Sequence, residues 1–200
     1  MEIDSIILGK ELKKLFQKFY IIEDVDIDFE DYATYKEALA IFQFDYNRYF
    51  PSENISKDKL FSRIELIGIL LYRISRHYYL NEKEEVALHY SNLGRIISGF
   101  EIFYSAEIGK GLKIYHGLGT VIGARCKIGE NVLVHQNVTF GDRNGGRPVL
   151  LDNVTVYAGA KILGKIICGN NSVIAANCVC MIDVPDYGLI AGIPGKVKNI

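Results

Sequence analysis

The C-terminal half of the chain repeats its apolar residues at every sixth position, and this repeat limits the possible folds more than any other feature. Counted in sixes from Ile108, the first position is aliphatic or otherwise apolar almost throughout, and the fifth is small or aliphatic. A period of six is neither the 3.6 of an α-helix nor the 2 of a single strand, so it indicates a repeat architecture. Each sextet supplies a short strand and a turn, and stacked coils bury both apolar positions in one continuous core.

The repeat is interrupted twice. The sextet "IYHGLG" is followed by two extra residues, Thr120 and Val121, before the count resumes at Ile122. A longer interruption, "GDRNGGRPV", separates Phe140 from Leu150. Interruptions rich in glycine and charge are typical of active-site loops, although a solvated loop without a catalytic role is the plainer alternative.

The first half of the chain has helical spacing, with apolar residues three and four positions apart. Helices are expected at 5–20, 32–50, 57–80 and 82–97. Asp4 or Ser5 precedes the first helix as a cap, and Pro51 ends the second. We therefore expect the α+β class, with an α-helical N-terminal domain over 1–100 and a parallel β-solenoid domain over 101–200.

Charge and hydropathy exclude some partners. The formal net charge of −1 predicts no electrostatic attraction to nucleic acid or to an anionic membrane. The longest apolar run, "LIGILLY", is far shorter than the roughly 20 residues that span a bilayer, so no membrane insertion is expected. The opening "MEIDSIILGKELKK" lacks the pattern of a signal peptide, so we expect a cytoplasmic protein.

The four cysteines all occupy apolar positions of the repeat. They are Cys126, Cys168, Cys178 and Cys180. The last two form a C-x-C pair, which lacks the C-x-x-C spacing of zinc and redox motifs. We expect buried free thiols and no metal site.

Several segments resemble the hexapeptide-repeat acyltransferases. The stretches "AEIGKGLKIYHGLGTVIGARCKIGENV", "NVTFG", "YAGAKILG" and "LIAGIPGKV" are similar to the serine O-acetyltransferase branch, which includes acetyltransferases of surface-polysaccharide sugars. The segment "LYRISRHYYLNEKEEVALHYSN" resembles the helical N-terminal domain of that branch, so the resemblance extends from about residue 40 onward. It implies a left-handed parallel β-helix of triangular cross-section, a handedness opposite to the usual crossover rule.

The resemblance also implies a catalytic pair. In this branch the histidine of the broken sextet is the catalytic base, and its partner is a carboxylate fifteen residues upstream; those positions are His116 and Glu101. An alcohol is nearly un-ionised at pH 7, and a histidine with a pKa of about 6.5 is suited to remove its proton. Glu101 would orient the ring and stabilise the imidazolium, which then protonates the departing thiol. A structural role is the alternative for a lone histidine.

Acetyl-CoA is the donor that the resemblance implies. Backbone near Gly141 would donate a hydrogen bond to the thioester oxygen as it becomes anionic. Three small residues would let the pantetheine arm lie against bare backbone: Ala158, Gly159 and Ala176. Three lysines would face the CoA phosphates: Lys161, Lys196 and Lys198. Small residues also occur in solenoid turns for purely structural reasons.

The acceptor-side residues depart from the serine-specific pattern. Tyr115 replaces the acid beside the base, Phe50 replaces an acid before a proline, and Arg147 replaces a histidine before a proline. An unpaired ammonium in a desolvated site costs several kcal/mol, so the loss of two carboxylates argues against free serine. We expect a capsule or lipopolysaccharide sugar as acceptor, contacted by these three residues, with serine as the alternative. His135 points outward one coil from His116, and neither it nor the loop 142–148 is assigned a role.

Two other protein classes fit the sequence less well. A γ-type carbonic anhydrase needs three zinc-binding histidines, whereas only His116 and His135 lie in the solenoid. A non-catalytic trimeric scaffold remains as an alternative. The exposed edge and flat apolar faces of a solenoid favour self-association, and the family forms trimers, so we expect a homotrimer with a dimer of trimers as the alternative.

Overall fold

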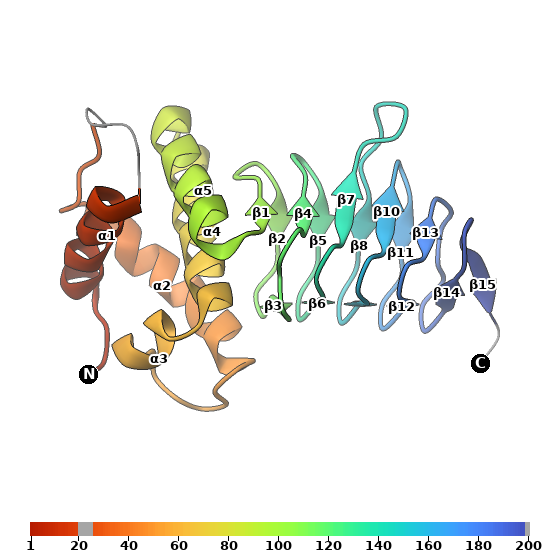
Figure 1. Cartoon of the computed structure of the whole chain (residues 1–200), viewed down its shortest axis with the longest axis horizontal. Coiled ribbons are helices and arrows are strands. Elements are labelled where there is room, and N and C mark those ends of the chain that lie inside the picture. Colours follow the sequence, from red (N-terminus) through yellow and green to blue (C-terminus); the bar gives the residue numbers. More distant parts are fainter. Residues whose placement is uncertain (20–25, 199–200) are drawn as a thin grey trace.

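The computed structural model describes residues 1–19 and 26–198 of the 200-residue chain. Helices fill the first half and short strands the second, in line along one long axis (Figure 1). The helices are α1 (Ser5–Phe19), α2 (Tyr32–Asn47), α3 (Lys57–Phe61), α4 (Ile64–Leu80) and α5 (Glu84–Ser98). The predicted α+β class, helices followed by a parallel β-solenoid, is confirmed.

The ends of the first two helices follow local sequence signals. Asp4 caps α1, because its Oδ1 accepts a hydrogen bond of 2.8 Å from the backbone N–H of Ile7. Asp31 caps α2 by accepting from the backbone N–H of Thr34. Helix α2 ends at Asn47, a few residues before Pro51.

The single helix expected over 57–80 is wrong, because the structure divides this segment into α3 and α4. Arg63 has extended backbone, with φ −124° and ψ 111°, and breaks the helix. Leu60 and Leu66 are both fully buried. The break therefore lies between two segments that both reach the core.

The solenoid consists of three sheets that the chain visits in turn (Figure 1). One sheet contains β1 (Glu101–Ile102), β4 (Val121–Ile122), β7 (Thr139–Gly141), β10 (Lys161–Leu163) and β13 (Val179–Cys180). Another contains β2 (Glu107–Ile108), β5 (Lys127–Ile128), β8 (Val149–Leu150) and β11 (Ile167–Cys168). The third contains β3 (Lys113–Ile114), β6 (Leu133–Val134), β9 (Thr155–Val156), β12 (Val173–Ile174), β14 (Leu189–Ala191) and β15 (Lys196–Lys198). Neighbouring strands pair in parallel, apart from the antiparallel pair β14–β15.

The first position of each sextet is buried, as the repeat predicts. These residues are Ile108, Ile114, Ile122, Ile128, Val134, Phe140, Leu150, Val156, Ile162, Cys168, Ile174 and Cys180. The predicted burial of the four cysteines is also confirmed. Across 1–19 and 26–198, no group of three or more histidine, cysteine, aspartate or glutamate side chains is arranged to hold a metal ion. Nor does any helix within those ranges combine the length and apolarity needed to cross a membrane.

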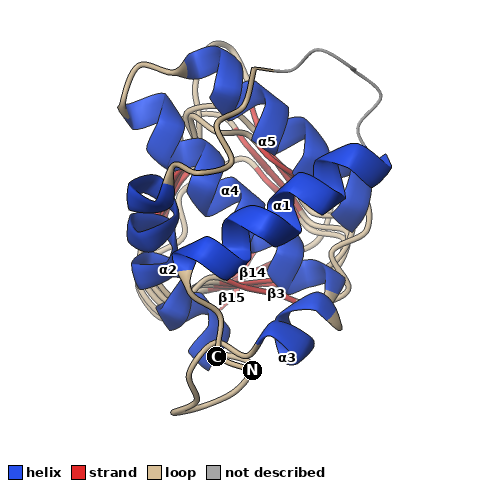
Figure 2. Cartoon of the chain, turned by 90° about the vertical axis from the view of Figure 1, so that its left-hand side faces the viewer, coloured by secondary structure: helices blue, strands red, loops and turns tan. Residues whose placement is uncertain are grey.

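A buried ion pair joins the helices to the first coil of the solenoid, and the helices cover that end of it (Figure 2). Arg73 on α4 donates to both carboxylate oxygens of Asp45 on α2, at 2.8 and 2.9 Å. The same guanidinium donates to the backbone carbonyls of Ile108 and Gly109, and Asp45 accepts from the backbone N–H of Leu112. Burial raises the pKa of Asp45, and Arg73 opposes that rise. We call this pair and its backbone contacts the Asp45–Arg73 clasp.

Candidate active site

His116 lies at a corner of the solenoid in a left-handed backbone conformation, with φ 56°. At most other corners the left-handed residue lies three positions before the next buried strand residue, as Asn131 does before Val134. Gly119, with φ 71°, occupies that regular place before Ile122. His116 is therefore an additional left-handed residue on a bulge made by the two-residue insertion. Non-glycine residues in this conformation are uncommon, and such strained positions concentrate at functional sites.

The insertion changes which residue fills the core below the bulge. Leu118, which the repeat places in the fifth position, is 68% exposed, whereas Thr120 is fully buried in its stead. The expected inward position of Leu118 is thus wrong, because two added residues shift the inward-facing position by two. The hydroxyl of Thr120 donates to the backbone carbonyl of His135 at 2.8 Å and accepts from the N–H of Val138 at 3.2 Å. The bulge is thereby fastened to the next coil.

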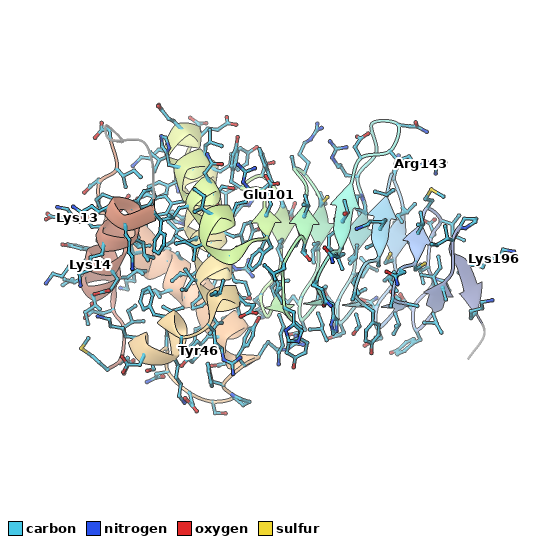
Figure 3. All side chains as sticks on the ribbon, viewed as in Figure 1. Lys13, Lys14, Tyr46, Glu101, Arg143 and Lys196 are labelled. Carbon is cyan, nitrogen blue, oxygen red and sulfur yellow. The ribbon has the colours of Figure 1, made fainter. Side chains whose placement is uncertain are left out.

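Glu101 lies on β1, directly beside this bulge. Its backbone N–H donates to the carbonyl of Thr120 at 2.9 Å. Its half-buried carboxylate lies 3.8 Å from Nη1 of Arg95, at the junction of α5 and the solenoid (Figure 3). The His116 side chain is exposed, and no hydrogen bond joins it to Glu101 in the part of the chain that the structure describes. The two segments share one corner, and the direct contact stays a prediction.

The bulge also packs on the start of the solenoid. A Cβ added at Gly117 would lie 2.4 Å from the ring of Phe100, so this position accepts only glycine without displacement. The N–H of Gly119 donates to the carbonyl of Gly99 at 2.9 Å. These contacts hold the chain on both sides of Leu118 and limit the movement of the corner.

Three aromatic side chains on successive coils form a row that begins beside His116, and we call them the aromatic ladder: Tyr115, His135 and Tyr157. The ring centroids of Tyr115 and His135 are 5.5 Å apart, and those of His135 and Tyr157 are 5.1 Å apart with planes at 26°. All three occupy the second position of their sextets, in "IYH", "VHQ" and "VYA", and this shared position is the sequence signal that could have predicted the ladder. The next coil places Ala175 beside Tyr157, so the ladder ends at a small side chain.

The charges near the ladder favour a neutral His135. Burial, and then the nearby charge of His116, lower the pKa of His135. The ammonium of Lys113 lowers the pKa of Tyr115 through a hydrogen bond and lies 4.7 Å from the centroid of its ring.

Phe50 lies shortly after the end of α2. The hydroxyl of its neighbour Tyr49 donates to the carbonyl of Ile114 at 2.7 Å, one residue before Tyr115. The ammonium nitrogen Nζ of Lys59 lies over the ring of Phe50, 4.7 Å from its centroid, in a cation–π contact. An acceptor contact for Phe50 stays a prediction.

Gly141 and Arg147 flank the long loop. Gly141 ends β7, and its carbonyl accepts from the N–H of Gly164 at 3.1 Å. Arg147 donates to the carbonyl of Ala124 at 2.9 Å and forms an ion pair with Asp142. Its charge therefore holds the base of the loop, and the predicted acceptor contact would require it to leave these partners.

The residues expected to bind the coenzyme are spread along the solenoid. Ala158 and Gly159 follow Tyr157 at the same corner, and Ala176 lies one coil further, where Asn177 donates to the carbonyl of Ala158. Lys161 is engaged with the backbone carbonyl of Asn137 at 2.5 Å. Two further lysines, Lys196 and Lys198, are exposed on β15, at the end of the solenoid far from Glu101 (Figure 3). A coenzyme role for these residues stays a prediction.

Comparison with known proteins gives consistent relatives. No protein-family model matches the chain. It is 36% identical over 151 residues to a serine acetyltransferase of Staphylococcus xylosus, covering 74% of this chain and 70% of that protein. It is 44% identical over 126 residues to a serine acetyltransferase of Staphylococcus aureus, covering 60% of this chain and 59% of that relative. This match spans less than two thirds of the length of the S. aureus protein.

Solved structures share both halves of the fold. The serine acetyltransferase of Neisseria gonorrhoeae in complex with serine aligns with a TM-score of 0.79 at 26% identity, over 100% of this chain and 85% of that one. A truncated serine acetyltransferase apoenzyme aligns with a TM-score of 0.74 at 25% identity, over 96% and 77%. The fold is the predicted helical region followed by a left-handed parallel β-helix of hexapeptide repeats.

Proposed function

The chain belongs to the serine acetyltransferase family of hexapeptide-repeat acyltransferases, and from this premise we propose that it is an acetyl-CoA-dependent O-acetyltransferase. The observation that carries the proposal is the left-handed His116 on a bulge beside the strand of Glu101. An exposed imidazole at a fixed corner is suited to accept a proton from a hydroxyl. The cytoplasmic location expected from the sequence is part of the same proposal.

In the proposed reaction His116 acts first as a base and then as an acid. One ring nitrogen takes the proton of the acceptor hydroxyl while its oxygen forms a bond to the acetyl carbon. The backbone near Gly141, on this chain or on a neighbouring copy, donates to the carbonyl oxygen as it becomes anionic. The imidazolium then returns the proton to the sulfur as the carbon–sulfur bond breaks, which yields an ester and free CoA.

Glu101 is proposed to orient His116. Its contact with Arg95 is 3.8 Å long and partly exposed, and such surface ion pairs contribute little free energy. Glu101 can therefore exchange this partner for the imidazolium when the proton is transferred. A carboxylate against the second ring nitrogen fixes the tautomer and stabilises the positive charge.

L-serine is the acceptor that the relatives favour, since they are named serine acetyltransferases and the N. gonorrhoeae structure holds serine. The predicted acceptor, a surface-polysaccharide sugar, is the second candidate. The aromatic ladder favours the sugar. Tyr115 and Tyr157 offer flat apolar surfaces with polar edges, which suit a sugar ring, whereas a pair of charged side chains would suit an amino acid better.

The test is an assay of free thiol release from acetyl-CoA with L-serine and with a panel of nucleotide-linked and lipid-linked sugars. Turnover with L-serine alone supports the first acceptor, and turnover with one sugar but not with L-serine supports the second. A protein that releases no thiol with any hydroxyl acceptor, and whose melting temperature acetyl-CoA leaves unchanged, contradicts the enzyme and supports the non-catalytic scaffold.

We also propose a homotrimer, with a dimer of trimers as the alternative. Large apolar side chains are exposed along the solenoid, among them Leu118, Ile167 and Ile193. Such surface favours association with further copies of the chain. Light scattering after size-exclusion chromatography separates the monomer, the trimer and the hexamer.

A further inference from the structure

A cavity of about 360 Å³ lies between the loop that follows β7 and the turn that follows β10. This loop projects from the solenoid and carries Arg143 (Figures 1 and 3). The lining includes two cations, Arg143 from the loop and Lys165 from the turn, together with the apolar Leu163, Ile166 and Met181. The lining contains no acidic residue. We propose that this cavity binds the phosphate or pyrophosphate group of a substrate.

The cavity is built by close packing of the loop on the turn. A Cβ added at Gly146 would lie 2.4 Å from the backbone nitrogen of Lys165. Gly164 has φ 93°, and a Cβ there would lie 3.1 Å from Cβ of Arg143. Only glycine allows this approach at both positions. The loop is therefore held against the turn, and the two cations are placed at the cavity before any ligand arrives.

The charges of Arg143 and Lys165 are available to a ligand. Three other cations of the solenoid are engaged in ion pairs: Arg147 with Asp142, Lys110 with Glu130 and Lys127 with Glu107. Within residues 1–19 and 26–198, neither Arg143 nor Lys165 has a side-chain hydrogen bond or an ion pair. Two unpaired cations at one cavity repel each other, and an anion between them removes that repulsion. Arg143 also offers the two-pronged geometry that phosphate oxygens accept.

The nature of the phosphate source rests on the proposed function. The backbone N–H of Gly164, in the turn, donates to the carbonyl of Gly141, and Leu163 is paired with Gly141 between β10 and β7. The cavity therefore adjoins the strand end where the thioester oxygen is proposed to lie. Acetyl-CoA carries a 3′-phosphate and a pyrophosphate, and a nucleotide-linked or lipid-linked sugar carries phosphate as well. L-serine carries none, so with that acceptor the coenzyme is the only source.

The experiment compares Arg143→Gln, Lys165→Gln and the double variant with Lys110→Gln, a matched control that removes an engaged cation of the same solenoid. Calorimetry measures the binding of CoA, dephospho-CoA and inorganic pyrophosphate to the full chain. Each single variant is expected to bind pyrophosphate about 3- to 10-fold more weakly, and the double variant about 10- to 100-fold more weakly, since each loses a charge-assisted contact. Melting temperatures and oligomeric state verify that all the variants fold.

The coenzymes then identify the source. If the 3′-phosphate is bound, dephospho-CoA binds the wild type as weakly as CoA binds the double variant. If the pyrophosphate of the coenzyme is bound, the double variant loses affinity for CoA and for dephospho-CoA by the same factor. If the acceptor supplies the phosphate, CoA affinity is unchanged and the KM of a nucleotide-linked sugar rises by the same factor.

Unchanged pyrophosphate and CoA affinities, together with an unchanged KM, would overturn the site. If the variants are active acetyltransferases with those unchanged values, the result contradicts the phosphate site and leaves the proposed function standing. Pyrophosphate binding is measured without turnover. If the wild type shows no acetyltransferase activity but binds pyrophosphate only when both cations are present, the result contradicts the proposed function and leaves the phosphate site standing.

Discussion

The hydroxyl of Thr120 donates a 2.8 Å hydrogen bond to the backbone carbonyl of His135 in the next coil. Thr120 is a buried polar residue in a position that other sextets give to small or aliphatic side chains. It also accepts from the N–H of Val138, so both polar functions of its hydroxyl are used. The bond connects the bulge that carries His116 to the aromatic ladder.

Replacing Thr120 with valine should destabilise the chain while preserving its shape. The buried N–H of Val138 would lose its recorded partner, which costs about 1–3 kcal/mol of unfolding free energy. Urea denaturation measures the change. Thr155→Val is the control, because Thr155 faces outward on β9 and should change stability by less than about 0.5 kcal/mol. Equal costs at the two positions would show that the Thr120 bond contributes nothing specific.

His116→Ala should lower kcat by at least about 100-fold, since positioned general bases contribute roughly 10²–10⁴-fold. Affinity for CoA and the oligomeric state should not change, because the side chain is exposed and packs against little. Glu101→Gln should reduce kcat less, since the amide still orients the ring. Half the wild-type rate in His116→Ala would rule out the mechanism.

Arg73→Ala should be among the most damaging single substitutions in the chain. It leaves Asp45 buried without its charge partner, which costs about 3–5 kcal/mol of unfolding free energy. Chemical denaturation measures the loss. Arg76→Ala is the matched control, since Arg76 makes only one long hydrogen bond among the described residues, 3.3 Å to the carbonyl of Ser105, and a cation–π contact with Tyr79, and has no ion pair there. Replacing the pair together, Arg73→Met with Asp45→Leu, should recover most of the loss, and a double variant as unstable as Arg73→Ala would contradict this account of the clasp.

His135 should make stability fall at acid pH. Its pKa is lowered in the folded chain, so the unfolded chain binds the proton more readily. Stability is therefore retained above the ordinary histidine pKa of about 6.5 and is lost as the pH falls below it. The free energy of unfolding of the wild type should drop more between about pH 7.5 and 5.5 than that of His135→Leu. The other histidines are common to both proteins, so parallel curves would contradict the assignment.

The predictions made from the repeat succeeded where the interactions are local and periodic. Burial of the first sextet position follows directly from the period of six, because every coil repeats the same geometry. The expected helix over 57–80 failed because the backbone is extended at Arg63, a break that apolar spacing alone does not reveal.

The candidate site was predictable only in part. The corner of His116 was found from the broken count, and Glu101 from resemblance to a family. The aromatic ladder was missed, because it depends on which coils lie next to each other and not on neighbours along the chain. Arg147 binds Ala124 and Asp142 within its own coil and loop, and its expected contact with an acceptor stays a prediction.

Periodicity was sufficient to identify a solenoid, the inward-facing residues of its regular sextets and the place where its regular winding is interrupted. Three-dimensional packing decided the rest: the Asp45–Arg73 clasp, the inward turn of Thr120 and the unpaired cations at the Arg143 cavity. The physical reason is range. A repeating pattern records forces that act between near neighbours in the chain, whereas these contacts form between side chains that meet only after the coils have stacked and the helices have docked on them.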